Sequence, residues 1–179
     1  MLRFATLLAK AAVAISLQGE SNNLVCNDME ITTPMKVTKD DTVIENMIIY
    51  AEPTSADSKA NDYALRITAD NVTIRNVLIY HAANGMGIYA FKANNLVLDN
   101  VQVIAYGNEW GAQPCPTRKP FMGYDCSNIK IVKSEDVQIS NVSTENGSRG
   151  ISLIKSPSPY LKNVVAKNPR GQQPAGQCF

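Results

Sequence analysis

The sequence predicts an all-β protein whose short parallel strands coil into a solenoid, a single-stranded parallel β-helix of four to five coils. The first observation is an asparagine that recurs at one place in a repeated apolar pattern, as Asn46, Asn76, Asn100, Asn141 and Asn163. The second is their spacing of 30, 24, 41 and 22 residues, which is a solenoid period with room for insertions. The third is that short β runs, and no helix-length pattern, fill each repeat.

Aligning the repeats on these asparagines gives four apolar columns. Alternate residues on each side of the asparagine are apolar, which places each pair on one face of a strand. The columns are Val72/Leu96/Val137/Pro159, Ile74/Leu98/Ile139/Leu161, Val77/Val101/Val142/Val164 and Ile79/Val103/Thr144/Ala166. The phase slips by one residue at the asparagine, so the chain must bend there for both pairs to face one interior. Asparagine accepts the left-handed backbone of a tight bend.

A further short strand completes each coil. Its examples are Gly87–Phe91, Asn128–Val132 and Gly150–Ile154, with inward columns Ile88/Ile129/Ile151 and Ala90/Ile131/Leu153. Leu65 and Ile67 fall one residue out of phase with these columns, so we expect the first coil to be the least regular. Coils stacked ~4.8 Å apart bring the asparagines above one another. The sequence therefore predicts an asparagine ladder, in which each side-chain amide donates to the next.

The bulk composition fits one domain with a buried core, since 45% of the 179 residues are hydrophobic. The formal net charge is +1, and Lys and Arg occur as single residues at predicted coil corners, so we expect no nucleic-acid face. No apolar run reaches the length of a membrane span. Residues 1–19 are interpreted either as a secretory signal peptide or as an amphipathic helix capping the solenoid, and residues 20–179 as the β-helix domain.

Three sequence triplets are N-glycosylation acceptors, at Asn71, Asn141 and Asn146. Asn141 belongs to the predicted ladder and Asn71 begins a strand, so Asn146, in a bend, is the candidate. Together with the signal-like start, this site predicts a secreted protein.

Cys115 and Cys126 lie within one irregular loop, and we expect them to form a disulfide there, with free thiols as the alternative. Cys26 and Cys178 belong near opposite ends of the stack and are not expected to pair with each other. No cysteine pair has metal-finger spacing and the chain has one histidine, so no metal site is expected.

Short strands with an asparagine at the tight second bend resemble the right-handed parallel β-helix superfamily of pectate lyases, polygalacturonases and alginate-modifying enzymes, over roughly residues 30–179. The repeat is specific for the fold and unspecific for the reaction, because that scaffold also carries tailspikes and non-catalytic adhesins. Enzymes of this superfamily usually have about twice as many coils. The resemblance therefore implies the N-terminal portion of a longer β-helix, whose open last coil invites association.

A loop at residues 107–127 interrupts the repeat and carries Trp110, Arg118 and Tyr124. In the resembled enzymes such loops wall a groove over the following strand, where an aromatic ring stacks on a sugar and Arg binds a carboxylate. The alternative is that its aromatic residues form a satellite core. The only glycine-rich motif, beginning at Gly85, matches a dinucleotide fingerprint but continues as a strand, so we reject a nucleotide site.

The outward face of the strand below that loop carries Tyr89, Lys130 and Ser152, with Arg149 at its rim. Lyases of the resembled kind use Lys or Arg as a base and often use calcium to neutralise the neighbouring uronate, so the resemblance implies Lys130 as the candidate base and allows calcium as a cofactor. The column contains no carboxylates, so a calcium cluster cannot be assigned to it. His81 is interpreted as a surface or turn residue.

Three functional hypotheses follow from these residues. The first is a secreted protein that acts on acidic polysaccharide, like a lyase, an epimerase or a glycoside hydrolase. The second is a non-catalytic carbohydrate-binding or surface module that uses the same face. The third is a structural module whose open end pairs with another chain.

Overall fold

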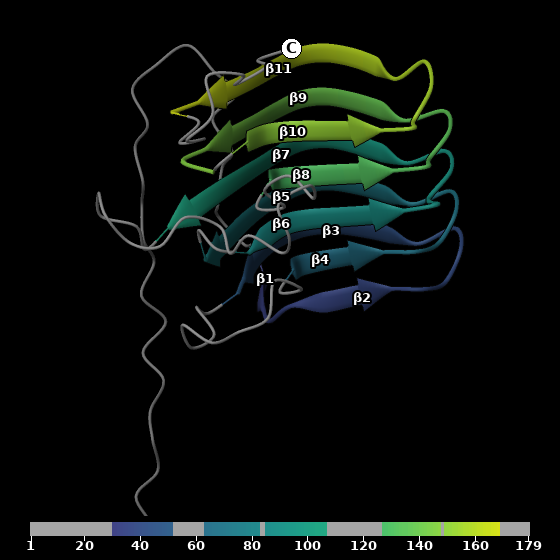
Figure 1. Ribbon diagram of the computed structural model, residues 1–179. Helices are drawn as coiled ribbons and strands as arrows, with labels where there is room; N and C mark the ends of the chain where they lie inside the picture. Colours follow the sequence, from purple (N-terminus) through teal and green to yellow (C-terminus); the bar gives the residue numbers. More distant parts are fainter. Residues whose placement is uncertain (1–29, 52–62, 83–84, 107–126, 148, 169–179) are drawn as a thin grey trace, which may run out of the picture.

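The computed structural model describes residues 30–51, 63–82, 85–106, 127–147 and 149–168, and these residues form eleven β-strands (Figure 1). Within these ranges the protein is all-β, without a helix. The strands are β1 (Glu30–Thr32), β2 (Met35–Val37), β3 (Val43–Tyr50), β4 (Tyr63–Ile67), β5 (Thr73–Ala82), β6 (Met86–Phe91), β7 (Val97–Tyr106), β8 (Ser127–Val132), β9 (Gln138–Glu145), β10 (Arg149–Ile154) and β11 (Tyr160–Lys167).

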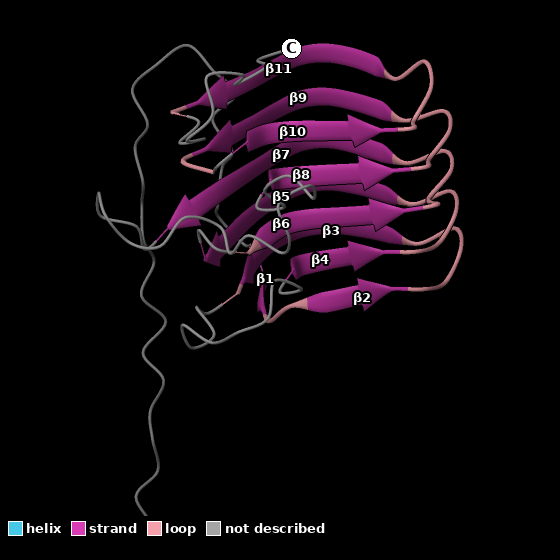
Figure 2. Cartoon of the chain, viewed as in Figure 1, coloured by secondary structure: helices cyan, strands magenta, loops and turns pink. Residues whose placement is uncertain are grey.

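The strands form two parallel sheets that the chain visits alternately. The odd-numbered strands make a six-stranded sheet in the order β1-β3-β5-β7-β9-β11, and the even-numbered strands make a five-stranded sheet in the order β10-β8-β6-β4-β2. Every neighbouring pair is parallel. Each pass through both sheets therefore adds one layer to the stack, as Figure 2 shows, with short turns along one edge.

The inward columns predicted from the repeat are confirmed by register and burial. Ile74 pairs with Leu98 and Leu98 with Ile139, and all three side chains are fully buried. In the other sheet Ile88 pairs with Ile129, which is also fully buried. The core between the sheets is thus a set of stacked aliphatic side chains, and their removal from water is the main stabilising contribution.

The bend at each repeated asparagine is confirmed. The prediction that the asparagine separates two different strands is wrong. Asn46, Asn76, Asn100, Asn141 and Asn163 all have left-handed backbones, with φ between 51° and 55°. The residues before and after each one nevertheless pair within the same strand, for example in β5 and β7. One left-handed residue turns the strand without ending its ladder of backbone hydrogen bonds, so each coil has two strands rather than three.

Side-chain amides connect the bends of successive layers. Asn76 Nδ2 donates to Asn46 Oδ1 at 3.1 Å, Asn100 Nδ2 to Asn76 Oδ1 at 2.8 Å, and Asn163 Nδ2 to Asn141 Oδ1 at 3.0 Å. Between these two runs the pattern changes. Asn141 Nδ2 donates to Asp99 Oδ1 at 3.0 Å, because this carboxylate lies beside Asn100 and is the stronger acceptor.

The expected irregularity of the first coil lies in a turn and not in the strand. Leu65 pairs with Ile88 and Ile67 with Ala90, so both residues point inward in register and are fully buried. The apparent phase error arises because Ile67 lies nine residues before Asn76, whereas its partner Ala90 lies ten residues before Asn100. Aligning the repeats on their asparagines therefore shifted β4 by one position.

The last layer is the least buried. Tyr160 and Leu161 of β11 are 57% and 40% exposed, and Ile154 of β10 is 38% exposed. Leu161 pairs with the fully buried Ile139 in the layer below, and the half-buried Leu153 pairs with the fully buried Ile131. Within the described residues, β11 and β10 are the outer strands at one end of the two sheets, and β1 and β2 are the outer strands at the other end.

Candidate functional site

The outward side of the five-stranded sheet carries a column of polar and aromatic side chains, one from each strand. Its members, from β2 to β10, are Lys36, Arg66, Tyr89, Lys130 and Ser152, which are direct partners in register. They alternate along each strand with buried residues such as Ile88 and Ala90, so strand geometry points them away from the core. We call this surface, with the lysines that directly follow its strands, the basic face.

These additional lysines occupy the first position after three successive strands. Lys92, Lys133 and Lys155 follow β6, β8 and β10 and have left-handed backbones, with φ of 52°, 55° and 52°. Lys92 Nζ and Lys133 Nζ lie 5.7 and 5.8 Å from the centre of the Phe91 ring. Phe91 alternates in β6 with the buried Ala90, so its ring and the two ammonium groups lie on the basic face.

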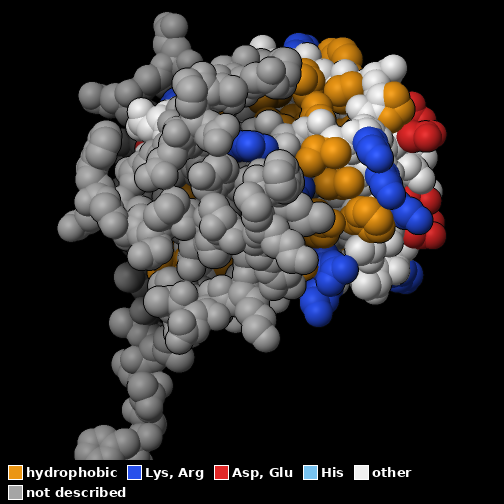
Figure 3. Space-filling model, viewed as in Figure 1, with side chains coloured by type: hydrophobic (Ala, Val, Ile, Leu, Met, Phe, Trp, Pro, Cys, Tyr) orange, Lys and Arg blue, Asp and Glu red, His pale blue; other side chains and the backbone are white. Residues whose placement is uncertain are grey.

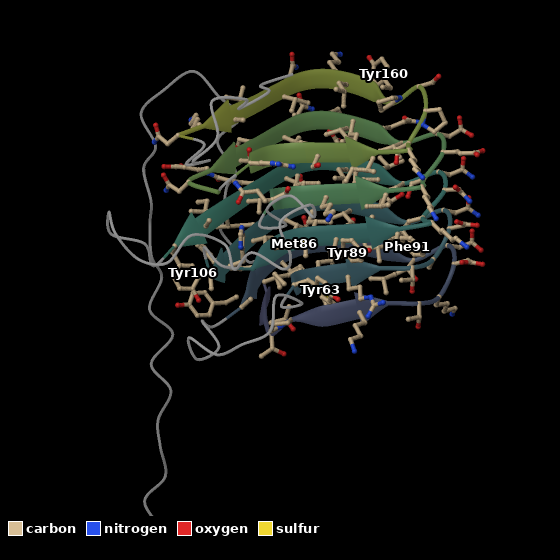
Figure 4. All side chains as sticks on the ribbon, viewed as in Figure 1. Tyr63, Met86, Tyr89, Phe91, Tyr106 and Tyr160 are labelled. Carbon is tan, nitrogen blue, oxygen red and sulfur yellow. The ribbon has the colours of Figure 1, made fainter. Side chains whose placement is uncertain are left out.

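Aromatic rings also lie between the cations of this face. The rings of Tyr63 and Tyr89 stack with their centres 5.3 Å apart and an angle of 14° between their planes. The guanidinium carbon of Arg66 lies 5.5 Å from the centre of the Tyr63 ring, within cation–π range. Arg66 Nε is buried and makes no hydrogen bond within the described structure. Figure 4 shows Tyr63, Tyr89 and Phe91 along this sheet.

The strands of the basic face carry charges of one sign. The five strands of this sheet contain Lys36, Arg66, Lys130 and Arg149 and no Asp or Glu. Figure 3 shows Lys and Arg beside apolar side chains on this side, and Asp and Glu at the edge near the short turns. The acidic residues of those turns are Asp40, Asp41, Asp70, Glu135 and Asp136. Stacking of the layers therefore aligns cations that occur as single residues far apart in the sequence.

The predicted site residues fall into three groups. Tyr89, Lys130 and Ser152 do lie in one column. Arg149 is exposed at the start of β10, where it pairs with Ser127, and strand alternation leaves it outside that column. Trp110, Arg118 and Tyr124, with Cys115 and Cys126 and the proposed groove wall, lie outside the described residues, as do residues 1–19.

Sequence reasoning missed Lys36, Tyr63, Arg66 and Phe91. Arg66 was missed because alignment on the asparagines shifted β4 by one residue and assigned Arg66 to the inward column. The signal that identifies Arg66 is the apolar alternation of Leu65 and Ile67, because the residue between two inward residues of a strand points outward. Lys36 follows from the same correction, because it pairs with Arg66.

The residues of the basic face do not fit a calcium site. Calcium prefers several oxygen ligands, usually including carboxylates. The described strands of this sheet supply cations, aromatic rings and a serine hydroxyl, and no cluster of three or more His, Cys, Asp or Glu side chains occurs in the described ranges.

His81 is not the surface or turn residue that we expected, because its side chain is 1% exposed within β5. Its Nε2 lies 2.8 Å from Asn128 Oδ1 and its Nδ1 lies 2.8 Å from the Ala82 carbonyl oxygen. Burial lowers the pKa of His81 from its ordinary value of 6.5, against the opposing effect of both hydrogen bonds. The interior alternation of β5 continues through this residue, and the two polar contacts allow it to be buried.

Comparison with known proteins does not assign the chain to a family. No protein-family model matches the chain, and no curated protein or solved structure is significantly similar to it. A search of the described residues finds no helix with the length and apolar character needed to cross a membrane.

Proposed function

We propose that this protein is a secreted right-handed parallel β-helix, of the pectate lyase-like type, whose basic face binds acidic polysaccharide. The alternation of the chain between two parallel sheets supports the β-helix. The repeated left-handed asparagines and the amide contacts between their layers support the asparagine ladder.

The observation that carries the proposed ligand is the basic face itself. The five described strands carry cations and aromatic rings on their outward side and contain no carboxylate. Neighbouring strands are ~4.8 Å apart, so the cations form a regular array along the stack. A linear polymer with one carboxylate per sugar is complementary to such an array, while its sugar faces suit the rings of Tyr63, Tyr89 and Phe91.

Binding to polygalacturonate and alginate, measured by titration calorimetry against neutral dextran, tests this proposal. We expect both acidic polymers to bind, dextran to bind much more weakly, and affinity to fall as salt screens the charges. Arg66→Gln and Lys133→Gln should each weaken binding several-fold, because each removes one cation from the face.

Lys162→Gln is the matched control. Lys162 is an exposed residue of β11 in the six-stranded sheet, and the substitution makes the same change in net charge. Its affinity for the acidic polymers should match that of the wild type. Equal losses in all three variants would show that net charge alone drives binding and would contradict a specific face.

The second candidate function is eliminative cleavage or epimerisation of the bound uronate, with Lys130 as the base. The observation that favours it is the place of Lys130 between Tyr89 and Ser152 in the middle of the column. Incubation with pectin, polygalacturonate and alginate, followed by absorbance of unsaturated ends and by reducing sugar, tests it. Activity lost in Lys130→Gln, with binding kept, supports catalysis; binding without product supports the non-catalytic module.

A further inference from the structure

A buried polar network joins β5, β8 and β9 behind the basic face. His81 contacts the Ala82 carbonyl oxygen through Nδ1 and Asn128 Oδ1 through Nε2, each at 2.8 Å. The amide nitrogen of Asn128 donates to the Glu145 carbonyl oxygen at 3.1 Å. His81 and Asn128 are both 1% exposed, so water has little access to replace any of these contacts.

The network has more acceptors than a neutral imidazole can satisfy. Three oxygens, from Ala82, Asn128 and Glu145, face two ring nitrogens and one amide nitrogen. A neutral histidine carries a proton on one ring nitrogen only. All three contacts are hydrogen bonds only when His81 is doubly protonated. A neutral ring that keeps its proton on Nδ1 has no proton on Nε2. The Asn128 amide then turns to donate to Nε2, which leaves the Glu145 carbonyl oxygen facing Oδ1.

We propose that His81 and Asn128 form a proton-dependent latch that holds the end of β9 to the start of β8. With the proton present, Asn128 accepts from His81 and donates to the Glu145 carbonyl oxygen. When the proton leaves, the amide turns and the hydrogen bond to β9 is broken. The latch has two states because an amide group fits the same space in either orientation.

Two glycines make the room that this pair occupies. A Cβ on Gly147 would lie 2.2 Å from Asn128 Oδ1, and one on Gly87 would lie 2.7 Å from the Asn128 carbonyl oxygen and 3.2 Å from His81 Cδ2. The backbone therefore closes directly around both side chains. This packing holds the Asn128 amide group in one plane. When His81 loses its proton, the amide can respond only by a 180° rotation that exchanges Oδ1 and Nδ2.

The surroundings make the proton costly but do not prevent its binding. Gly87 of β6, Ala105 of β7 and Asn128 of β8 face His81 and carry no charge. From β9, Glu145 contributes its carbonyl oxygen, while its carboxylate accepts a hydrogen bond from Asn146 Nδ2 at 3.4 Å. Burial lowers the pKa of His81, and both of its hydrogen bonds raise it. The latch therefore closes on the acid side of pH 6.5.

The latch lies where it affects strands of the basic face. Asn128 is the second residue of β8, which carries Lys130, and Glu145 ends β9 shortly before Arg149 begins β10. Acidification thus changes the hydrogen bonds at the start of β8, a strand of the basic face, and at the end of β9. This inference does not depend on the proposed glycan ligand.

Because the chain has a single histidine, NMR of the wild-type protein tests the latch without a variant. We expect neutral His81 to carry its proton on Nδ1 and to gain a second proton on Nε2 during acid titration. The side-chain amide resonances of Asn128 should shift with the same midpoint. A neutral ring protonated on Nε2, a ring that never titrates in the folded protein, or Asn128 resonances that ignore the His81 midpoint would overturn the proposal.

Two variants extend the test. His81→Gln should abolish the pH response of the Asn128 amide at that midpoint. Asn128→Asp fixes an acceptor beside Nε2 and should raise the His81 midpoint by about one pH unit or more, because a carboxylate stabilises the imidazolium. An unchanged midpoint in a folded Asn128→Asp protein would show that the two side chains are not coupled.

Discussion

At the scale of single residues, the fold depends on short polar side chains at positions with left-handed backbones. The repeated asparagines Asn46, Asn76, Asn100, Asn141 and Asn163 form one such set. A second, which sequence analysis missed, lies in the short turns, where Asn71 Nδ2 donates to Asp41 Oδ1 at 3.0 Å and Asn95 Nδ2 donates to Asn71 Oδ1 at 2.8 Å. Asp41, Asn71 and Asn95 have φ of 59°, 56° and 54°. Asn and Asp serve in both sets because they tolerate this conformation and bond to the next layer.

Substitutions of Asn76 distinguish the contribution of its left-handed backbone from that of its hydrogen bonds. Asn76 donates to Asn46, accepts from Asn100 and has a φ of 53°. Asn76→Gly keeps the backbone conformation and should lower the free energy of unfolding by about 1 kcal/mol through the lost hydrogen bonds. Asn76→Ala adds the strain of a left-handed alanine and should cost about 1–2 kcal/mol more. Urea denaturation measures both. Equal values for the two variants would mean that backbone strain contributes nothing.

His81 predicts a specific pH dependence of stability. Its folded pKa lies below 6.5, so the unfolded chain binds more protons in the range between the two values. The contribution of neutral His81 is fully present above pH 6.5 and is lost as the pH falls towards the folded pKa, by at most about 1.4 kcal/mol per pH unit. Urea denaturation between about pH 5 and pH 8 should show this slope. In His81→Gln, which does not titrate, that slope should disappear; a steeper slope would contradict the assignment.

At the scale of elements, the close approach of the two sheets at one edge of the stack depends on glycine in β6. A Cβ on Gly87 would lie 2.3 Å from Val103 Cγ1 of β7 and 2.7 Å from the Asn128 carbonyl oxygen of β8. The second contact is with backbone, so it cannot be relieved by a side-chain rotation. Gly87 therefore fixes how closely β6 approaches both neighbours, and its role is packing rather than nucleotide binding.

Gly87→Ala should lower the free energy of unfolding by about 1–3 kcal/mol through overpacking. Combining it with Val103→Ala removes the closer of the two clashes. The double variant should therefore be more stable than the sum of the single effects predicts, although the clash with the Asn128 carbonyl oxygen remains. Thermal denaturation of the four proteins completes the cycle. Strict additivity would show that Gly87 and Val103 do not constrain each other.

At the scale of the whole molecule, the protein is a one-dimensional stack in which each layer contacts the layers above and below. The middle strands β5 and β7 have neighbours on both sides and carry fully buried residues such as Ile74 and Leu98. The outermost described strands carry exposed apolar residues, including Val165 of β11 at 42%. Stability in such a stack is close to a sum of terms between neighbours, so it should decrease towards this end.

Hydrogen exchange measured by mass spectrometry should show that gradient. Backbone amides of β5 and β7 should exchange slowest, and those of β10 and β11 should exchange markedly faster under native conditions. The fully buried Val77 of β5 and the half-buried Val164 of β11 occupy equivalent places in their repeats, so peptides around them give a matched comparison. Uniform protection across these four strands would indicate that the stack opens as one cooperative unit.

The sequence by itself determined the all-β class, the inward columns and the left-handed asparagines, because period-two burial and the backbone tolerance of asparagine are local properties of the chain. It did not reveal that both sides of each bend belong to one strand, since this depends on hydrogen bonds to neighbouring layers. Arg66 shows the same limit, because its outward position follows from pairing with Lys36 and Tyr89 and not from its distance to the next asparagine. The repeat predicted the column of Tyr89, Lys130 and Ser152. Its extension through Arg66 and Lys36, and the His81–Asn128 network, were revealed only by the tertiary structure. Stacking places Tyr89 beside Lys130, 41 positions away, and His81 beside Asn128, 47 positions away. Such proximity gathers charges of one sign on the face and gives the buried histidine its hydrogen-bond partner.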